Sequence, residues 1–534
     1  MELLTRNIFS QNIICRGNIQ VTLEDDINVS DTKPDIDKVV KLQGEIQISS
    51  VTPVEEKVHI RGLLQFSLLY TTSDDFRPIH NLKGQIPIEE TVNMEGLQTE
   101  QDVLCHYDLE DCQARLINSR KVNIRALISL QCCQEHQQIV PAGIDIVSEA
   151  AARTEMETMP APDGLHRQFD KFSFTRLANY KKDVLRIRDE LPLPKGKSNI
   201  DTLLYYEIVP QNLQNRMIED GIRFLGDLKV FLIYIPEDED RRLEYLEAEL
   251  PFDSTLSCEE CDEEMVPDIE LLGITKSMDV RGDEDGENRI LDLELSLNFR
   301  MKFYQDEVFD YLKDAYSTAC TLQLVQTDVD CRKLLMKNQS VLRISDHLKT
   351  GENNAPISEI CNATGTVKID ERTVVEDGIE LEGVVELDVL YLTEDDNAPL
   401  ALLKDTIPFS HVIEIKGISP KDDYELQPLI NQISVIMLDE QEVEAKVVLS
   451  LCAFVFTHIN EKIITDIREA PIDIGRLQAM PGLVGFIAEE SGSLWSIAKE
   501  YNTTVENIIK LNGLEKDWVN QGDRLLLLKQ IDGI

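Results

Sequence analysis

The segment VHIRGLLQFSLLY, residues 58–70, places an apolar side chain or a glycine at every second position. Successive side chains of a strand point to opposite faces, so this period of two predicts a long β-strand with one buried face. The glycine, Gly62, lies on the inward face. It predicts a β-bulge or a close approach of a neighbouring backbone at that position.

The same pattern recurs as IRFLGDLKVFLIY, residues 222–234, and IELEGVVELDVLY, residues 379–391. In each copy Tyr follows Gly by eight residues and Pro follows Tyr by seventeen: Gly62, Tyr70, Pro87; Gly226, Tyr234, Pro251; Gly383, Tyr391, Pro408. The glycines are 164 and then 157 residues apart, which is too long for a stacked solenoid. A copy of about 125 residues can bury its own core. We therefore expect three separate beads with one topology, each with the segment that ends at the Tyr as an interior strand.

The fold class predicted is mainly β, with three tandem β-rich domains and a small α+β module of βααβ order. The β domains are expected at residues 12–140, 178–305 and 335–458, and the module at 483–530. Linkers are expected at 141–177, 306–334 and 459–482, and the middle linker should carry a short helix around YLKDAY, residues 311–316.

The charge of the chain restricts its partners. Its 53 Lys and Arg against 98 Asp and Glu give a net charge of −45, which repels phosphate backbones and anionic lipid. We therefore expect no binding to nucleic acid or to membrane surfaces. Solubility is the simple reason for such a charge, and a basic partner surface is the alternative. The segment MELLTRNIFS, residues 1–10, lacks the pattern of a signal peptide, and no apolar run approaches the ~20 residues of a membrane span, so a cytosolic location is expected.

The sequence holds no complete motif of catalysis, metal binding or redox chemistry. Eleven irregularly spaced cysteines suit free thiols in a reducing compartment. The pair Cys258 and Cys261 lacks two further zinc ligands, and the flanking acids disfavour a thiolate. The segment GKS, residues 196–198, lacks the first glycine of a phosphate-binding loop. We expect no enzyme activity, no catalytic residue, no cofactor and no metal.

The C-terminal residues predict a strand at 484–488, a helix at 493–501, a second helix that ends before Gly513, and a strand at 524–528. Ser493 should cap the first helix, TTVE (503–506) is a capping box for the second, and Gly513 suits a left-handed C-cap. Both tryptophans lie here. Trp495 and Ile497 share an amphipathic helix and are assigned to the core, whereas Trp518, in a loop, is a candidate contact for a partner.

The segments SLWSIA (493–498), YNTTV (501–505), IIKLNGL (508–514) and QGDRL (521–525) resemble a LysM domain. The resemblance implies the βααβ fold and a groove that binds chitin or peptidoglycan in the family. The usual Pro-Gly-Asp-Thr of one groove loop is replaced by ESGS, residues 490–493, which argues against glycan binding. Ser493, Asn512, Leu514 and Trp518 are therefore expected to contact a protein partner.

The repeats resemble the SPOCS domain of spore coat proteins in KPDI (33–36), in the Gly–Tyr–Pro spacing and in SRKVN (119–123). Three such domains before one LysM domain are similar to clostridial coat morphogenetic proteins of the SipL type. The resemblance implies a scaffold in the mother-cell cytoplasm at the forespore surface, which binds the coat-basement ATPase and other coat proteins. The alternatives are a glycan-binding wall protein, as LysM alone suggests, and an enzyme within the repeats.

Overall fold

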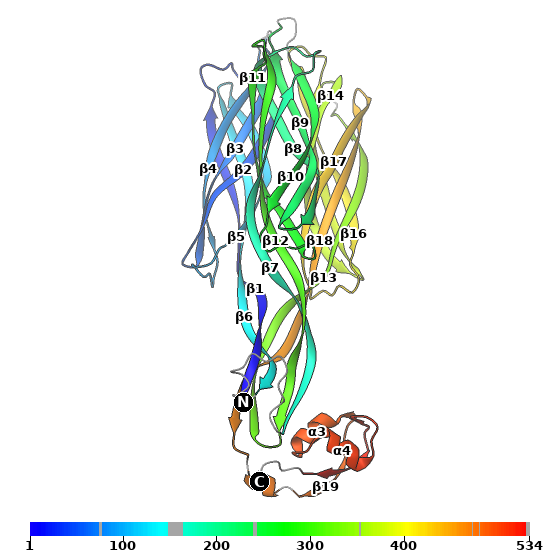
Figure 1. Ribbon diagram of the computed structural model, residues 1–534. Helices are drawn as coiled ribbons and strands as arrows, with labels where there is room; N and C mark the ends of the chain where they lie inside the picture. The colour runs from blue at the N-terminus through cyan, green and yellow to red at the C-terminus, as the bar shows by residue number, and fades with distance from the viewer. Residues whose placement is uncertain are drawn as a thin grey trace.

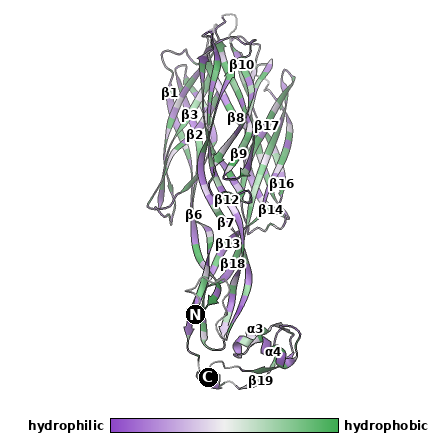
Figure 2. Cartoon of the chain, in the orientation of Figure 1, coloured by the Kyte–Doolittle hydropathy of each residue, from purple (hydrophilic) through white to green (hydrophobic). Residues whose placement is uncertain are grey.

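The computed structural model describes residues 1–534 except 74–76, 148–163, 239–242, 352–353, 473, 480 and 530–534. The three β-rich copies form a head, their longest strands continue into a narrow stalk, and a small module lies beside the foot of the stalk (Figure 1). Hydrophobic and hydrophilic residues alternate along the strands (Figure 2). Among the described residues, no helix is long and apolar enough to cross a membrane.

Each copy is a sandwich of two three-stranded antiparallel sheets, with the same strand order in all three copies. The first copy has β2 (Lys38–Val54), β3 (Lys57–Thr71) and β4 (Ile79–Asn93) in one sheet, and β1 (Glu2–Asn28), β6 (Lys121–Val147) and β5 (Leu104–Asn118) in the other. The second has β8 (Ile200–Ile218), β9 (Gly221–Pro236) and β10 (Glu244–Ser257), then β7 (Leu165–Pro192), β12 (Asn288–Ser317) and β11 (Val266–Gly282). The third has β14 (Glu359–Val375), β15 (Gly378–Leu392) and β16 (Leu400–Glu414), then β13 (Thr321–Lys349), β18 (Glu442–Ala470) and β17 (Asp423–Asp439).

The predicted interior strands are confirmed as β3, β9 and β15, each the middle strand of its sheet. The repeat glycines occupy equivalent positions, because each pairs with the residue that follows the repeat proline. These pairs are Gly62 with Ile88, Gly226 with Phe252, and Gly383 with Phe409.

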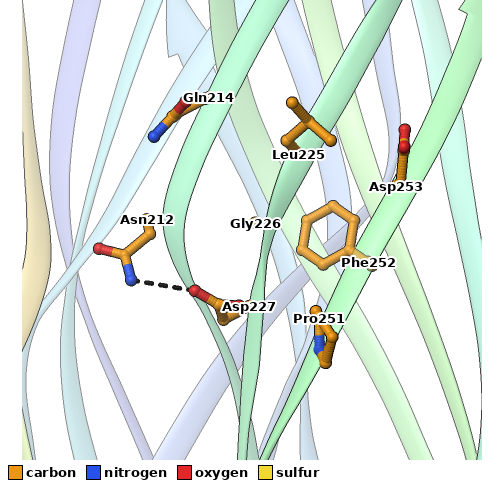
Figure 3. A pocket seen from close by; sticks show the side chains of 8 residues that line it. All are labelled: Asn212, Gln214, Leu225, Gly226, Asp227, Pro251, Phe252 and Asp253. Carbon is orange, nitrogen blue, oxygen red and sulfur yellow. Dashed lines mark hydrogen bonds between the residues drawn. The ribbon is translucent and has the colours of Figure 1, made fainter.

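Each repeat glycine faces a β-bulge in the neighbouring strand, at 48–50 in β2, 211–214 in β8 and 369–371 in β14. A Cβ added to Gly62 would lie 2.6 Å from the backbone oxygen of Gln47. At Gly226 it would lie 2.9 Å from the ring of Phe252, which flanks this glycine in Figure 3. The bulge and the close approach predicted from the sequence are both present.

The SRKVN segment has a structural role at the end of the first sandwich. Arg120 donates to the backbone oxygens of Lys33 (2.7 Å) and Ser30 (3.0 Å) and to the carboxylate of Asp35 (3.2 Å). In the second copy Arg289 donates in the same way to Lys197, at 3.0 Å. An arginine fork that binds several loop oxygens at once fixes the conformation of the loop before the second strand.

The prediction of separate beads is wrong, because the three copies pack around a common axis. Lys41, Tyr205 and Asn362 are buried and equivalent, each paired with the residue before the repeat tyrosine. Lys41 Nζ donates to Thr364 Oγ1 (3.3 Å) and lies 5.6 Å from the Tyr205 ring centroid. Asn362 Nδ2 donates to Glu207 Oε2 (3.1 Å). Every copy thus contacts both others, and an apolar cluster beside these groups also combines all three: Leu69, Ile79, Leu204, Tyr205, Phe231, Ile233, Ile235, Cys361, Leu390 and Leu400.

The linkers and the helix expected between the copies are also wrong. Described residues of 141–177 and 306–334 mostly belong to β6, β7, β12 and β13, and residues 459–470 belong to β18. The described part of 471–482 contains the short helix α2 (Ile474–Ala479). Residues 148–163 of the first segment lie outside the described residues. These strands form the stalk, whose core draws on all copies: Ile8, Val140, Ala142, Phe172, Phe174, Phe309, Tyr311, Val329, Cys331 and Ile463. A bulge at Lys313 breaks the period of two near YLKDAY, which concealed the strand.

A second buried polar cluster joins the copies above the stalk. Lys302 Nζ lies 3.0 Å from Glu135 of the first copy and 3.7 Å from Glu425 of the third. Gln427 donates to Asp268 at 2.6 Å. Burial raises the pKa of the Asp268 carboxyl to about 6, and the negative charge of Glu425 adds to the rise. The folded protein therefore carries a carboxyl that holds its proton more tightly than in the unfolded chain.

Replacing Gly62 by Ala should lower the free energy of unfolding by about 1–3 kcal/mol, because the methyl group would overlap a backbone oxygen that the sheet holds in place. Gly196→Ala is the matched control, since nothing lies within 4 Å of its added Cβ. Chemical unfolding of both variants measures the difference. Equal stability of the two would contradict the close approach at Gly62.

The stability of the protein should depend on Asp268 between about pH 4 and pH 6. An unfolded Asp has a pKa of about 3.9, so in this window the folded state binds more protons and the free energy of unfolding falls as pH rises. Asp268→Asn keeps the acceptor for Gln427 and removes the charge. The variant should lose this part of the pH dependence and exceed the wild type in stability above pH 6, as unfolding curves at several pH values will measure. Asp310→Asn, at an exposed position of β12, is the control.

Candidate partner-binding site

The C-terminal module has the predicted βααβ order. It contains β19 (Leu483–Ile487), α3 (Leu494–Glu500), α4 (Val505–Asn512) and β22 (Arg524–Leu528), with the short strands β20 (Gly492–Ser493) and β21 (Trp518–Val519). Ser493 caps α3, Thr504 caps α4, and Gly513 ends α4 with a left-handed φ of 64°. The helix caps predicted at Ser493 and Gly513 are confirmed, whereas the N-cap of α4 is Thr504 and not Thr503, the first residue of the predicted capping box.

The pairing of β20 with β21 brings two of the candidate residues together. Ser493 pairs with Trp518, and Gly492 pairs with Val519. Val519 is buried in the core of the module, whereas Trp518 leaves 54% of its surface exposed. A short strand thus anchors Trp518 beside the start of α3 and turns its side chain toward solvent.

The other predicted residues have different surroundings. Asn512 is occupied within the module: its side chain donates to the backbone oxygens of Ile508 (2.9 Å) and Leu526 (2.8 Å) and accepts from Leu526 N (2.6 Å). Because these bonds tie α4 to β22, Asn512 has a structural role in the module, and its contact with a partner stays a prediction. Leu514 is half-buried against the core, and Ile497 is a core residue as expected.

Trp495 lies between the module and the stalk. It packs at the edge of the module core, and its ring meets the ring of Tyr316 edge-on at 4.9 Å between centroids. Its Nε1 donates to Asp314 Oδ2 at 2.8 Å. The assignment of Trp495 to the core holds only in part, because the sequence pattern could not show that the end of β12 would reach this helix.

Polar side chains beside Trp518 are engaged with the module's own backbone. Ser493 Oγ accepts from Trp495 N (3.3 Å), and Ser491 Oγ accepts from Gln521 N (2.9 Å). The outer face of the β19–β22 sheet is apolar instead, with four large exposed aliphatic side chains: Leu483, Ile487, Leu526 and Leu528. The module therefore offers a partner exposed apolar side chains at Trp518 and on this sheet face.

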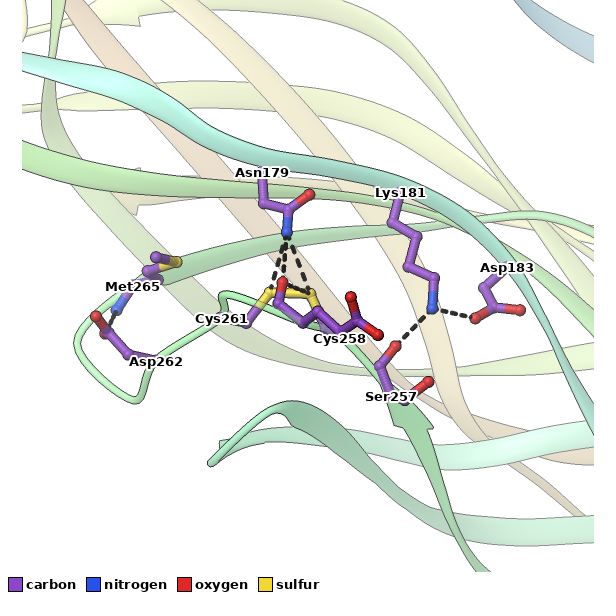
Figure 4. The surroundings of a disulfide bond; sticks show 9 residues. Asn179, Lys181, Asp183, Ser257, Cys258, Cys261, Asp262 and Met265 are labelled. Carbon is purple, nitrogen blue, oxygen red and sulfur yellow. Dashed lines mark hydrogen bonds and ion pairs between the residues drawn. A yellow bond between two sulfur atoms is a disulfide. The ribbon is translucent and has the colours of Figure 1, made fainter.

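The cysteine prediction needs one correction, because Cys258 and Cys261 form a disulfide (Figure 4). The other nine cysteines, all within the described residues, are free thiols. Both bonded cysteines are buried in the core of the second copy, in a loop whose equivalents carry Met94 and Leu97 in the first copy and Ile415 and Ile418 in the third. The loop turns both side chains inward, away from the flanking acids that were expected to disfavour a thiolate.

Outside the module, the surface hollow of the second copy and possible metal ligands are the other candidates for a site. The hollow around Gly226 in Figure 3 is lined by Asp227, which accepts from Asn212 at 3.1 Å, and by Asp253, which pairs with Arg223. Both carboxylates already have partners at the surface. Across the described part of the chain, no three His, Cys, Asp or Glu residues gather in a way that could hold a metal ion.

Truncation of Trp518 and truncation of Ile497 should affect stability differently, because the first side chain is exposed and the second is buried. Trp518→Ala should change the free energy of unfolding of the module by no more than about 0.5 kcal/mol, because its side chain is largely solvated. Ile497→Ala should cost about 2–5 kcal/mol, because it leaves a cavity in the core. Thermal unfolding of the full chain, followed by tryptophan emission, will measure both. A strongly destabilised Trp518→Ala variant would show that Trp518 is a core residue.

Comparison with known families agrees with this division of the chain. The family model of the SipL SPOCS domain matches residues 35–117 and 356–438, and that of the LysM domain matches residues 492–527. The SPOCS matches fall in the first and third copies, and the second copy shares their strand order. Neither the curated proteins nor the solved structures gave a match. The matched domains, SPOCS domains before a C-terminal LysM domain, agree with the SipL type and indicate a sporulation coat-related protein.

Proposed function

We propose that this chain is a non-enzymatic scaffold of endospore coat assembly, placed at the forespore surface in the mother-cell cytoplasm. Its LysM domain binds the ATPase that forms the basement layer of the coat. The observation that carries the proposal is the exposed side chain of Trp518, held by β21 next to Ser493. An aromatic side chain of this kind is the usual anchor of a protein interface.

The chemistry of the module supports a protein partner over a glycan. Sugar recognition combines aromatic rings with free polar groups that bond to hydroxyls. Ser491, Ser493 and Asn512 already bond to the module's own backbone. A protein interface needs an apolar centre with a polar rim, and exposed apolar patches mark such interfaces. Trp518 supplies one exposed apolar group for such a centre, and the four aliphatic side chains on the outer face of the β19–β22 sheet supply another.

The buried contacts between the three copies support the scaffold role. Lys41, Tyr205 and Asn362 occupy equivalent positions and pack each copy against the others. Such groups build a rigid body. A long rod with a binding module at one end suits a protein that holds other proteins at a defined place.

Binding of the full chain to the purified coat-basement ATPase tests the proposal. Trp518→Ala should raise the dissociation constant thirtyfold or more, because loss of an aromatic anchor costs about 2–4 kcal/mol of binding free energy. Phe169→Ala, which removes an exposed aromatic side chain from the stalk, should leave the affinity unchanged. Titration with chitin and peptidoglycan fragments is the parallel arm.

Tight glycan binding without measurable ATPase binding would contradict the proposal and favour the glycan-binding alternative. If Trp518→Ala binds the ATPase as the wild type does, the scaffold role stands but the contact lies elsewhere. The outer face of the β19–β22 sheet would then be the next surface to mutate.

A further inference from the structure

Asp314, near the end of β12, bonds to the LysM domain through both of its carboxylate oxygens. Oδ2 accepts from Trp495 Nε1 at 2.8 Å, and Oδ1 lies 2.5 Å from Lys499 Nζ. Trp495 and Lys499 are four residues apart on α3 and therefore share one face of that helix. A single stalk carboxylate thus binds one face of α3 at two points.

Tyr316, two residues further on, completes the core of the LysM domain from outside. It is 5% exposed and belongs to the apolar cluster of that domain. Its ring lies between His166 of the stalk and Trp495, with both centroids at 4.9 Å. Its hydroxyl donates to the backbone oxygen of Thr503 at 3.0 Å, and burial raises the pKa of this phenol, which keeps it a donor.

The contact leaves the candidate partner site open. The joint, defined as Asp314 and Tyr316 of the stalk with Trp495, Lys499 and Thr503 of the LysM domain, uses the side of α3 that faces the stalk (Figure 1). Trp518 is held by β21 and stays exposed while the joint is formed. The two tryptophans therefore face different neighbours, one the chain itself and the other solvent.

We propose that the foot of the stalk is a docking site for the chain's own LysM domain, and that the joint holds the exposed side chain of Trp518 in a fixed direction relative to the head. The LysM domain follows the stalk strand β18 in the chain, and the joint connects it to the stalk a second time, through β12. With two connections, a partner bound at Trp518 is carried at a set angle to the rod. This inference does not depend on what the LysM domain binds.

The chain has two tryptophans, so a ¹H–¹⁵N spectrum of the full protein contains two indole N–H signals. In the wild type both should relax at the rate of the whole rod, and the Trp495 signal should exchange slowly with water. Asp314→Ala should shift the Trp495 signal and speed its exchange. It should also lengthen the transverse relaxation time of both signals severalfold, because a freed domain tumbles faster.

Asp310→Ala, on the same strand but at an exposed position, is the matched control and should change neither signal. Tyr316→Phe keeps the ring, removes the bond to Thr503, and should give an intermediate relaxation time. Asp314→Lys combined with Lys499→Asp restores an ion pair, so slow tumbling of both signals should return although the indole acceptor is lost. The proposal is overturned if the wild-type signals already relax as a small free domain, or if Asp314→Ala behaves as Asp310→Ala does.

Discussion

The pairing of the first and last strands of each copy is the constraint on which the whole molecule depends. These pairs are β1 with β6, β7 with β12 and β13 with β18. Each pair extends beyond its sandwich into the stalk as a two-stranded ribbon. A two-stranded ribbon is marginally stable alone in water. The ribbons gain stability by burying their apolar faces against one another, as Ile8, Phe172 and Ile463 do. Each copy thus needs the other two, although its sandwich core is its own.

Buried polar groups determine which copy lies beside which. Apolar contacts tolerate many arrangements, whereas a buried charge costs several kcal/mol unless it is paired. Lys302 meets carboxylates of the other two copies, and Lys41 lies between Thr364 and Tyr205. Because equivalent positions carry different groups, exchange of two copies would leave such charges without partners. Among the described carboxyl residues, Glu207, Glu244 and Asp268 are buried, and the others lie where water reaches them.

The foot of the stalk connects this arrangement to the LysM domain. Tyr316 is the second-last residue of β12 in the second copy and also belongs to the core of the LysM domain. The rod and the module therefore share one buried side chain, and the orientation of the module follows from the packing of the stalk. Trp518 gains a fixed position from this contact without taking part in it.

The sequence by itself determined the local elements and their faces. The period of two ending at Tyr70 and the capping residues Ser493 and Gly513 depend on neighbours within a few residues, and such patterns can be read directly. The tertiary structure decided what those faces meet. A bulge at Lys313 reset the side-chain parity and made a strand resemble a helix. No local pattern encodes the roles of three further groups. Contacts with β22 and β12 decided those of Asn512 and Trp495, and the geometry of a loop decided that of the Cys258–Cys261 pair. Asp314 lies 181 residues before Trp495, and only the folded stalk brings the two together.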